Sequence, residues 1–229
     1  MDNNSPQVSE SLTYAFFDVD DTLISVKSMF GFQDHWFSQH PDDDEVERFN
    51  KDMQRRHEKG ISWEFLNQLY YSHFEGRDVN DVMACGKAWF EEQERSNARF
   101  YFTAIVDVLK RHQEDGCEPV FVSGSFPAVL NPIAKRLGVN TILSINMETQ
   151  GNRYTGKILP PQTIGTGKAE AILNFLNEVG GKPEHCYAYG DDISDLPMLN
   201  TVGHPHVISG GRSLVEQTKD FGWPVLAPY

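Results

Sequence analysis

The chain is poor in cysteine and contains no long apolar run. It has three cysteines in 229 residues, and they lie far apart in the sequence (Cys85, Cys117 and Cys186). Because they form no closely spaced pair, we expect reduced, structural thiols in a cytosolic protein. No apolar segment approaches the ~20 residues that cross a bilayer. Residues 1–11 are polar, so they are not expected to form a signal peptide, and residues 1–10 are expected to form a loose tail.

Positive charge is also scarce. The chain has 20 Lys and Arg residues against 33 Asp and Glu residues, which gives a formal net charge of −13. Nucleic acids and anionic membranes bind basic surfaces, so neither is expected as the main partner. A small anionic ligand is still compatible with this charge, because a local pocket can have the opposite sign to the whole surface.

The most informative stretch is an apolar run that ends in acids. Residues 12–19 are apolar and partly aromatic, which predicts a buried strand. Asp18 and Asp20 lie at its carboxyl end and point to the same side of an extended backbone. Carboxylates packed this closely are costly unless a cation or a reaction uses them. An acidic turn or a helix cap would give the same short pattern. Other segments of the sequence are therefore needed to distinguish these alternatives from a functional site.

The pattern of apolar and charged residues changes at about residue 97. Residues 24–97 carry aromatic and charged side chains at helical spacing, which predicts several amphipathic helices. After this segment, expected strands alternate with expected helices, and a hairpin is expected around the turn at 150–152. The strands are expected at 118–122, 141–145, 186–189, 206–208 and 223–226. The helices are expected at 98–116, 127–137, 167–179, 196–200 and from about residue 213. The alternation predicts an α/β fold with a parallel sheet.

Polar clusters follow three of the expected strands. They are the acids that begin at Asp18, the segment 123–125 (Ser-Gly-Ser) and the segment 191–195, while Lys168 begins a helix. Because the carboxyl ends of neighbouring parallel strands meet in one crevice, we expect these groups to lie close together. The helical segment inserted after the first strand can fold over this crevice as a lid.

The expected crevice has a strong excess of negative charge. Asp18, Asp20, Asp191 and Asp195 face a single cation, Lys168. Two like charges about 4 Å apart repel by ~4 kcal/mol at an effective dielectric constant near 20. A divalent cation removes this conflict, and all-oxygen ligands favour Mg²⁺ over zinc.

Taken in order, these motifs resemble the haloacid dehalogenase (HAD) superfamily, and most closely its subfamily IB, the phosphoserine-phosphatase-like group. The matching motifs are Asp-Val-Asp-Asp-Thr at 18–22, Val-Ser-Gly at 122–124, Lys168, and Gly-Asp-Asp-Ile-Ser-Asp-Leu-Pro at 190–197. The resemblance covers nearly the whole chain outside the helical insertion. It implies a Rossmann-like HAD core of residues 1–23 and 98–229 and an α-helical cap of residues 24–97.

The resemblance also implies catalytic and metal-binding roles. Asp18 would attack phosphorus and form an aspartyl-phosphate, while Asp20 would protonate the leaving oxygen and then deprotonate the hydrolytic water. Mg²⁺ would be held by Asp18, Asp191 and the backbone carbonyl of Asp20, with Asp195 orienting a water on the metal. A carboxylate nucleophile divides hydrolysis into two easier steps, which agrees with these roles.

The phosphoryl group would be bound by Ser123, Gly124 and Lys168. The function implied is a Mg²⁺-dependent phosphomonoester hydrolase that acts on a small organic phosphate. A phosphotransferase or mutase with the same intermediate and a lipid-head-group phosphatase are alternatives on the same scaffold. A non-enzymatic regulatory protein is a further alternative, which the complete set of motif residues disfavours.

Three features depart from the family pattern or concern the substrate. Asp192 stands where the family usually has a small residue, and we expect it to face outward. Lys27 stands where phosphoserine phosphatases carry a glutamate for the substrate ammonium, and residues 62–71 contain no arginine for the substrate carboxylate. Lys27 is therefore a candidate substrate contact, the alternative being a surface lysine. Aromatic side chains of the insertion, such as Phe30, Trp36 and Trp63, are expected to supply apolar pocket walls.

Overall fold

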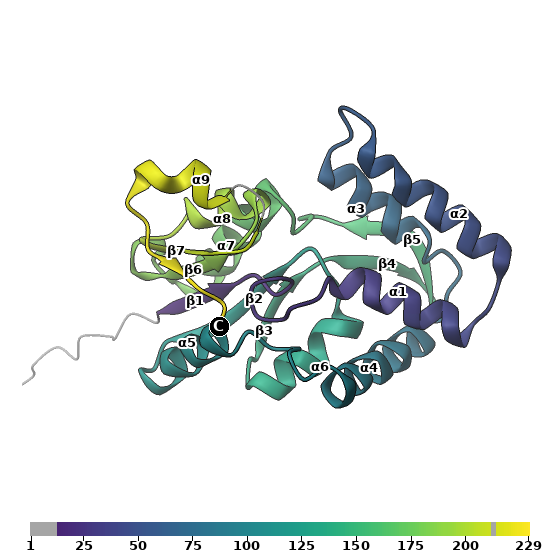
Figure 1. Cartoon of the computed structure of the whole chain (residues 1–229), viewed down its shortest axis with the longest axis horizontal. Helices are drawn as coiled ribbons and strands as arrows, with labels where there is room; N and C mark the ends of the chain where they lie inside the picture. The colour runs from purple at the N-terminus through teal and green to yellow at the C-terminus, as the bar shows by residue number, and fades with distance from the viewer. Residues whose placement is uncertain (1–12, 212–213) are drawn as a thin grey trace, which may run out of the picture.

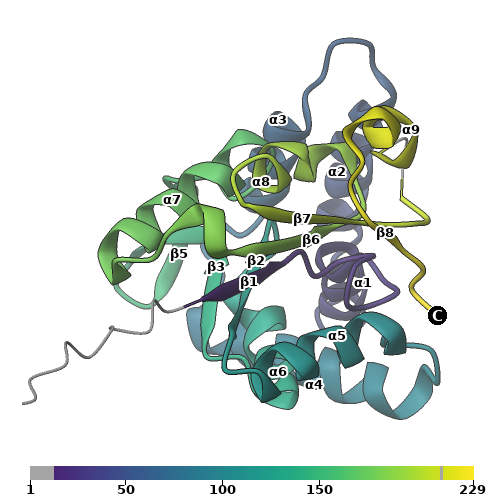
Figure 2. The ribbon, with the colours of Figure 1, turned by 90° about the vertical axis from the view of Figure 1, so that its left-hand side faces the viewer.

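A parallel sheet forms the centre of the molecule (Figures 1 and 2). In the computed structural model, which describes residues 13–211 and 214–229, six strands run in the order β3-β2-β1-β6-β7-β8. All neighbouring pairs are parallel. The strands are β1 (Tyr14–Phe17), β2 (Glu118–Ser123), β3 (Thr141–Ser144), β6 (Tyr187–Gly190), β7 (His204–Ile208) and β8 (Val225–Leu226). Three expectations fall outside the described residues: the loose tail at 1–10, the start of the first strand at residue 12 and the start of the last helix at about residue 213.

Strand β1 lies between β2 and β6. Phe17, at its end, is paired with Phe121 of β2 and Tyr189 of β6. Because the three strands are parallel and in this register, the residues that follow them meet at one edge of the sheet. This edge carries Asp18, Ser123 and Asp191, as the sequence predicted.

Helices cover both faces of the sheet (Figure 2). Along β1, Tyr14 and Phe16 pack against one helical layer, whereas Ala15 and Phe17 pack against the other. Strand β1 is therefore buried on both faces, which explains its continuous apolar run. The first layer holds α7 (Thr166–Val179), α8 (Leu196–Leu199) and α9 (Leu214–Thr218), with the 3₁₀ turns η2 (Pro183–His185), η3 (Ile193–Asp195) and η4 (Lys219–Phe221) nearby. The second layer holds α5 (Thr103–Glu114) and α6 (Pro127–Leu137).

Four helices are inserted after β1, as the resemblance implied. They are α1 (Ser28–Gln39), α2 (Asp43–Gln54), α3 (Trp63–Ser72) and α4 (Val79–Ser96), with the 3₁₀ turn η1 (Arg55–His57) after α2. Three of them begin with side-chain caps, in which Asp42, Ser62 and Asp78 accept hydrogen bonds from backbone N–H groups of the first turn. Helices α1 to α3 extend beyond the carboxyl end of the sheet (Figure 1).

The last inserted helix, α4, packs against α6 of the second helical layer. A Cβ atom at Gly86 of α4 would lie 2.3 Å from the carbonyl oxygen of Ala128, so this contact requires glycine. The expected helix 98–116 starts later, at Thr103, because Phe100 and Phe102 make backbone hydrogen bonds with residues 23–25. The division into a core of residues 1–23 and 98–229 and a cap of residues 24–97 remains a prediction.

The expected hairpin consists of β4 (Asn146–Gln150) and β5 (Arg153–Leu159). Its second strand lies beside α3 and the segment that follows this helix. There, the N–H of Gly76 donates to the carbonyl of Tyr154, and the N–H of Tyr154 donates to the carbonyl of Arg77. The hairpin therefore connects the core to the inserted helices, a position that the sequence did not predict.

The three cysteines are buried, and none of them forms a disulfide in the described structure. Within residues 13–211 and 214–229, no helix combines the length and the apolar character needed to cross a membrane. The cytosolic location stays a prediction.

Candidate active site

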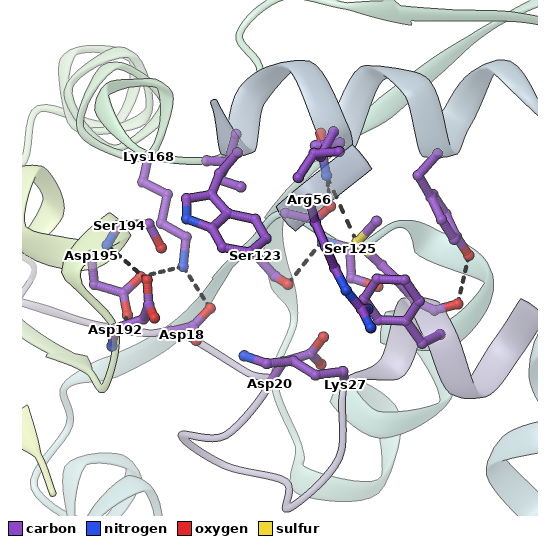
Figure 3. Close-up of a pocket in the computed structure, with 18 of the residues that line it drawn as sticks. Asp18, Asp20, Lys27, Arg56, Ser123, Ser125, Lys168, Asp192, Ser194 and Asp195 are labelled. Carbon is purple, nitrogen blue, oxygen red and sulfur yellow. Dashed lines mark hydrogen bonds and ion pairs between the residues drawn. The ribbon is translucent and has the colours of Figure 1, made fainter. Parts of the chain in front are cut away.

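Three carboxylates, those of Asp18, Asp191 and Asp195, and one ammonium group meet at the carboxyl end of the sheet. Figure 3 shows the ammonium group, from Lys168, between Asp18 and Asp195. The ammonium Nζ of Lys168, in the first turn of α7, lies 2.5 Å from Asp18 Oδ1 and 2.6 Å from Asp195 Oδ1. Carboxylate oxygens of Asp18, Asp191 and Asp195 lie within 4.8 Å of one another, and all three residues are buried. The structure thus brings together four of the residues that the sequence predicted for the site.

A tight turn after β6 positions Asp195. Its Oδ2 accepts hydrogen bonds from the N–H groups of Asp191 and Asp192, both at 3.1 Å. The turn passes close to Gly190, where a Cβ atom would lie 2.6 Å from the Cβ of Asp195. The sequence prediction for Asp192 was wrong, because its side chain is buried and accepts a hydrogen bond from the N–H of Ser194. Asp192 therefore helps to cap η3.

Burial dominates the electrostatics of the carboxylate cluster. Burial raises the pKa of Asp18 well above its usual range; Lys168 opposes this shift, and the charges of Asp195 and Asp191 add to it. Burial, followed by the charge of Asp195, raises the pKa of Asp191 to about 7. Burial alone would lower the pKa of Lys168, but Asp18 and Asp195 raise it above its ordinary value. Lys168 therefore stays charged.

The donor set of this cluster fits a hard divalent cation. One ammonium group faces three buried carboxylates, so the site keeps an excess of negative charge. All the available ligand atoms of Asp18, Asp191 and Asp195 are oxygens, which suits Mg²⁺. Thr22 contributes indirectly, because its Oγ1 donates to Asp191 Oδ1 at 3.0 Å and so fixes this carboxylate.

The Asp20 carboxylate points away from the cluster and towards the inserted helices. Its Oδ2 accepts hydrogen bonds from the N–H and the Oγ of Ser28, both at 3.0 Å, and Ser28 Oγ lies 2.8 Å from Ser125 Oγ. Among the described residues, Asp20 Oδ1 has no hydrogen-bond partner, although it is buried. Burial raises the pKa of Asp20 to about 6, against the opposing effects of Lys27 and Ser28. The sequence gave no signal for Ser28, because its contact depends on how α1 is placed.

The loop after β2 is held by hydrogen bonds from the core. Ser123 Oγ accepts a hydrogen bond from the N–H of Ser125 at 3.1 Å, so its own hydroxyl hydrogen is available to a ligand. Thr163 Oγ1 donates to the Ser123 carbonyl at 2.7 Å. Ser123 is buried and lines the same pocket as Asp18 and Lys168.

Helix α3 holds the same loop from the side of the inserted helices. The carbonyl of Gly124 accepts hydrogen bonds from Asn67 Nδ2 and from the Tyr71 hydroxyl, both at 2.9 Å. Gln162 Nε2 in turn donates to Asn67 Oδ1 at 3.0 Å. Both lone pairs of the Gly124 carbonyl are therefore used by α3, which fixes the orientation of this peptide group.

A pocket of about 570 Å³ extends from the carboxylate cluster towards α1, η1 and α3. Phe30 and Trp63 line it, as the sequence predicted. Trp36 does not, because it is buried between the inserted helices, with the Arg77 guanidinium 4.5 Å from its ring centre. The sequence therefore placed two of the three aromatic side chains correctly.

Basic side chains also line the pocket. Lys27 lies at its edge, half exposed, with its Nζ 2.8 Å from Asp21 Oδ2. Arg56 and His57 reach the pocket from η1 and were not predicted. Their signal in the sequence was the run Arg55-Arg56-His57, but a basic run between two helices is more often a solvated surface.

The fold and the site agree with a known family. Over residues 15–200, the chain matches the family of haloacid dehalogenase-like hydrolases. The chain belongs to this family. The predicted family and the predicted α/β fold with an inserted helical cap are confirmed.

Similar proteins support the enzyme class. A protein of Mycobacterium tuberculosis (strain ATCC 25618 / H37Rv) named "Probable phosphatase Rv3661" is 30% identical over 224 residues, which cover 94% of this chain and 75% of the relative. "Histidinol-phosphatase" of Neisseria meningitidis serogroup C (strain 8013) is 26% identical over 227 residues, which cover 93% of this chain and 97% of the relative. The predicted enzyme class, a phosphatase, is confirmed.

Solved structures show the same architecture. A protein of unknown function from Bordetella pertussis Tohama I matches with a TM-score of 0.82 and 25% identity, over 96% of this chain and 100% of that chain. A substrate-bound phosphoserine phosphatase complex matches with a TM-score of 0.65 and 17% identity, over 91% of each chain. At this identity, the second likeness concerns the fold alone.

Proposed function

We propose that the protein is a Mg²⁺-dependent phosphomonoesterase that hydrolyses a small organic phosphate through an aspartyl-phosphate on Asp18. The observation that carries this proposal is the buried group of Asp18, Asp191, Asp195 and Lys168 at one end of a pocket. The phosphatase names of the relatives support it.

In the first half of the reaction, an oxygen of Asp18 attacks phosphorus and the bond from phosphorus to the leaving oxygen breaks. Asp20 gives its proton to that oxygen, so the product leaves as an alcohol. The raised pKa of Asp20, about 6, keeps a useful fraction protonated near neutral pH. Ser28 holds one oxygen of Asp20, and the other is left to donate the proton.

In the second half, a water molecule attacks phosphorus while Asp20, now ionised, accepts its proton. The bond between phosphorus and Asp18 breaks, and inorganic phosphate is released. Ser123, the backbone N–H of Gly124 and Lys168 bind the phosphoryl oxygens through both halves. Ser125, Thr163 and α3 hold the loop that carries Ser123 and Gly124, whereas Asp18 and Asp195 hold Lys168.

The metal would be held by Asp18, Asp191 and the backbone carbonyl of Asp20, next to Asp195. It would supply positive charge that offsets the negative charge of the phosphoryl group and the carboxylates. Lys27 is proposed as a substrate contact at the pocket edge, and its positive charge argues against phosphoserine as the substrate, because it would repel the substrate ammonium.

The test of this proposal is phosphate release from a panel of phosphorylated metabolites, including histidinol phosphate and phosphoserine, by the wild type and by Asp18→Asn. We expect the variant to lose several powers of ten in kcat, because it lacks the nucleophile. A thermal melt checks that the variant is folded. Turnover close to that of the wild type in folded Asp18→Asn would refute the nucleophile assignment.

A further inference from the structure

The charged side chains of the pocket are divided between its two sides. Among the described residues that line it, the carboxylates all belong to the core side: Asp18, Asp20, Asp192 and Asp195. The inserted segment contributes Lys27, Arg56 and His57. The side of the pocket formed by the inserted segment therefore carries the basic groups, which attract anions.

Of the two full cations on that side, Lys27 is already paired. Its Nζ lies 2.8 Å from Asp21 Oδ2. Burial lowers the pKa of Lys27, but Asp20 and Asp21 outweigh this effect and raise it, which indicates how strongly these carboxylates attract its charge. Lys27 is thus held at the acidic loop after β1.

Arg56 has a different environment from that of its neighbour Arg55. Arg55 Nε lies 3.5 Å from Glu58 Oε1, and its guanidinium lies 5.1 Å from the centre of the Phe65 ring. Arg56 is exposed, and in the described part of the chain its side-chain hydrogen bond goes to His57 Nε2, at 3.3 Å. Figure 3 shows Arg56 entering the pocket from η1, while Lys168 enters it from α7.

The walls between these two ends are largely apolar. They are formed by Met29, Phe30, Met53, Trp63, Leu66 and Ile164. In a pocket of about 570 Å³, a phosphoryl group bound at Asp18 leaves room for an organic portion of aromatic size.

We infer that the preferred substrate is a phosphomonoester whose organic portion has an apolar body and carries a carboxylate, which Arg56 binds. This inference rests on the proposed function and adds the class of substrate. A guanidinium group binds a carboxylate through two parallel hydrogen bonds. An ammonium group on the substrate would instead meet Arg56 and would have no carboxylate of the inserted segment as a partner. Phosphates of amino alcohols are accordingly poor substrates.

Three aryl phosphates that differ in charge at the far end test this inference. They are 3-(4-phosphonooxyphenyl)propionate, phenyl phosphate and 4-(2-aminoethyl)phenyl phosphate, and the readout is kcat/KM from phosphate release. We expect the wild type to prefer the carboxylate compound to phenyl phosphate about tenfold, because a hydrogen bond to a charged group contributes this much or more. The ammonium compound is expected to be the poorest of the three.

Arg56→Gln is expected to reduce the preference for the carboxylate compound over phenyl phosphate from about tenfold to near one. Arg55→Gln, at the neighbouring position, is the matched control and is expected to keep the preference. Arg56→Lys, which keeps the charge but loses the planar pair of donors, is expected to keep part of it. A wild type that prefers the ammonium compound, or an unchanged ratio in Arg56→Gln, would overturn the inference.

The proposed function and this inference fail in different ways. If the wild type hydrolyses none of the three compounds and none of the metabolite panel, the proposed function fails. Thermal melts of Asp18→Asn with each compound then test the pocket by binding alone. We expect the carboxylate compound to raise the melting temperature most, and Arg56→Gln in the same background to remove this advantage. Equal shifts for all three compounds in Asp18→Asn would refute the role of Arg56.

Discussion

At the scale of single residues, the site depends on how Asp20 is held. Ser28 Oγ and N–H bind one carboxylate oxygen of Asp20, and Ser28 Oγ also contacts Ser125 in the loop after β2. The acid of the proposed mechanism is therefore oriented by a helix of the inserted segment. Ser28 acts as a positioning residue, since it lies behind the carboxylate.

We expect Ser28→Ala to lower kcat about 5- to 30-fold, with a smaller change in KM, because the Asp20 carboxylate loses one of its two holding bonds. A hydrogen bond from Ser28 lowers the pKa of Asp20, so its loss raises that pKa. The alkaline limb of the pH profile of kcat should then move to higher pH. Ser38→Ala, an exposed position on the same helix, is the control. If Ser28→Ala lowers kcat but leaves the pH profile of kcat unchanged, the positioning role is contradicted.

The sequence predicted Asp18, Asp191 and Asp195 because strand ends and charge excess can be recognised in one dimension. It failed for Asp192, whose orientation follows from the backbone of a tight turn after Gly190. It also failed for Arg56, since a basic residue in a short turn gives no indication of which side chain will face a pocket. Contacts across the fold carry no local signal.

At the scale of elements, α3 connects the pocket with the loop after β2, which is proposed to bind the phosphoryl group. It places Trp63 and Leu66 in the pocket wall, and from the same helix Asn67 and Tyr71 bind the carbonyl of Gly124. A displacement of α3 would therefore disturb both the organic portion of a substrate and the donors for its phosphoryl group.

Tyr71→Phe tests this connection, because it removes one donor to Gly124 and leaves Asn67 in place. We expect the free energy of unfolding to fall by about 1 kcal/mol and kcat to fall several-fold for every substrate, without a change in substrate ranking. Urea unfolding and kcat/KM for two phosphate esters measure these effects. Ser72→Ala, whose hydroxyl bonds within α3, is the control. A change in ranking with an unchanged kcat would show that Tyr71 acts on the organic portion instead.

The order of strands and helices could be predicted from periodicity, since apolar runs and helical spacing are local properties. Helix α6, for example, ends at Leu137 before Gly138, as expected. The start of α5 was missed because residues 98–102 pair with the segment after β1, a tertiary effect that overrides helical propensity. The hairpin was predicted, but its place beside α3 was not, because packing between distant segments leaves no periodic pattern.

At the scale of the whole molecule, stability depends on the charge of the carboxylates in and beside the carboxylate cluster. Asp20 and Asp191 have pKa values of about 6 and about 7, raised from 3.8 by burial. The folded state therefore binds their protons more tightly than the unfolded state does. Their contribution to stability is present below about pH 4 and is lost as the pH rises through 6 and 7.

Melting temperatures at pH 5 and pH 8, with EDTA or with Mg²⁺, test this charge balance. In EDTA, we expect the protein to melt at a lower temperature at pH 8 than at pH 5, because the carboxylates are then ionised and repel one another. Since Mg²⁺ competes with protons for these carboxylates, it should stabilise the protein more at pH 8 than at pH 5. The expected gain in the free energy of unfolding is about 2.7 kcal/mol when the Mg²⁺ concentration is a hundred times its Kd. Asp191→Asn should lose most of this gain. Equal melting temperatures with and without Mg²⁺ at pH 8 would argue against a metal at this cluster.

The central position of β1 has a consequence for biosynthesis. Its partners β2 and β6 follow it in the chain by about 100 and about 170 residues, so its contacts are of high sequence separation. At about 5 to 20 residues per second, the ribosome needs roughly 5 to 35 s to deliver them. During this time β1, which is apolar and aromatic, lacks its neighbouring strands and can form non-native contacts. The carboxylate cluster cannot assemble until residue 195 has emerged, so a nascent chain that ends before β6 holds no complete site.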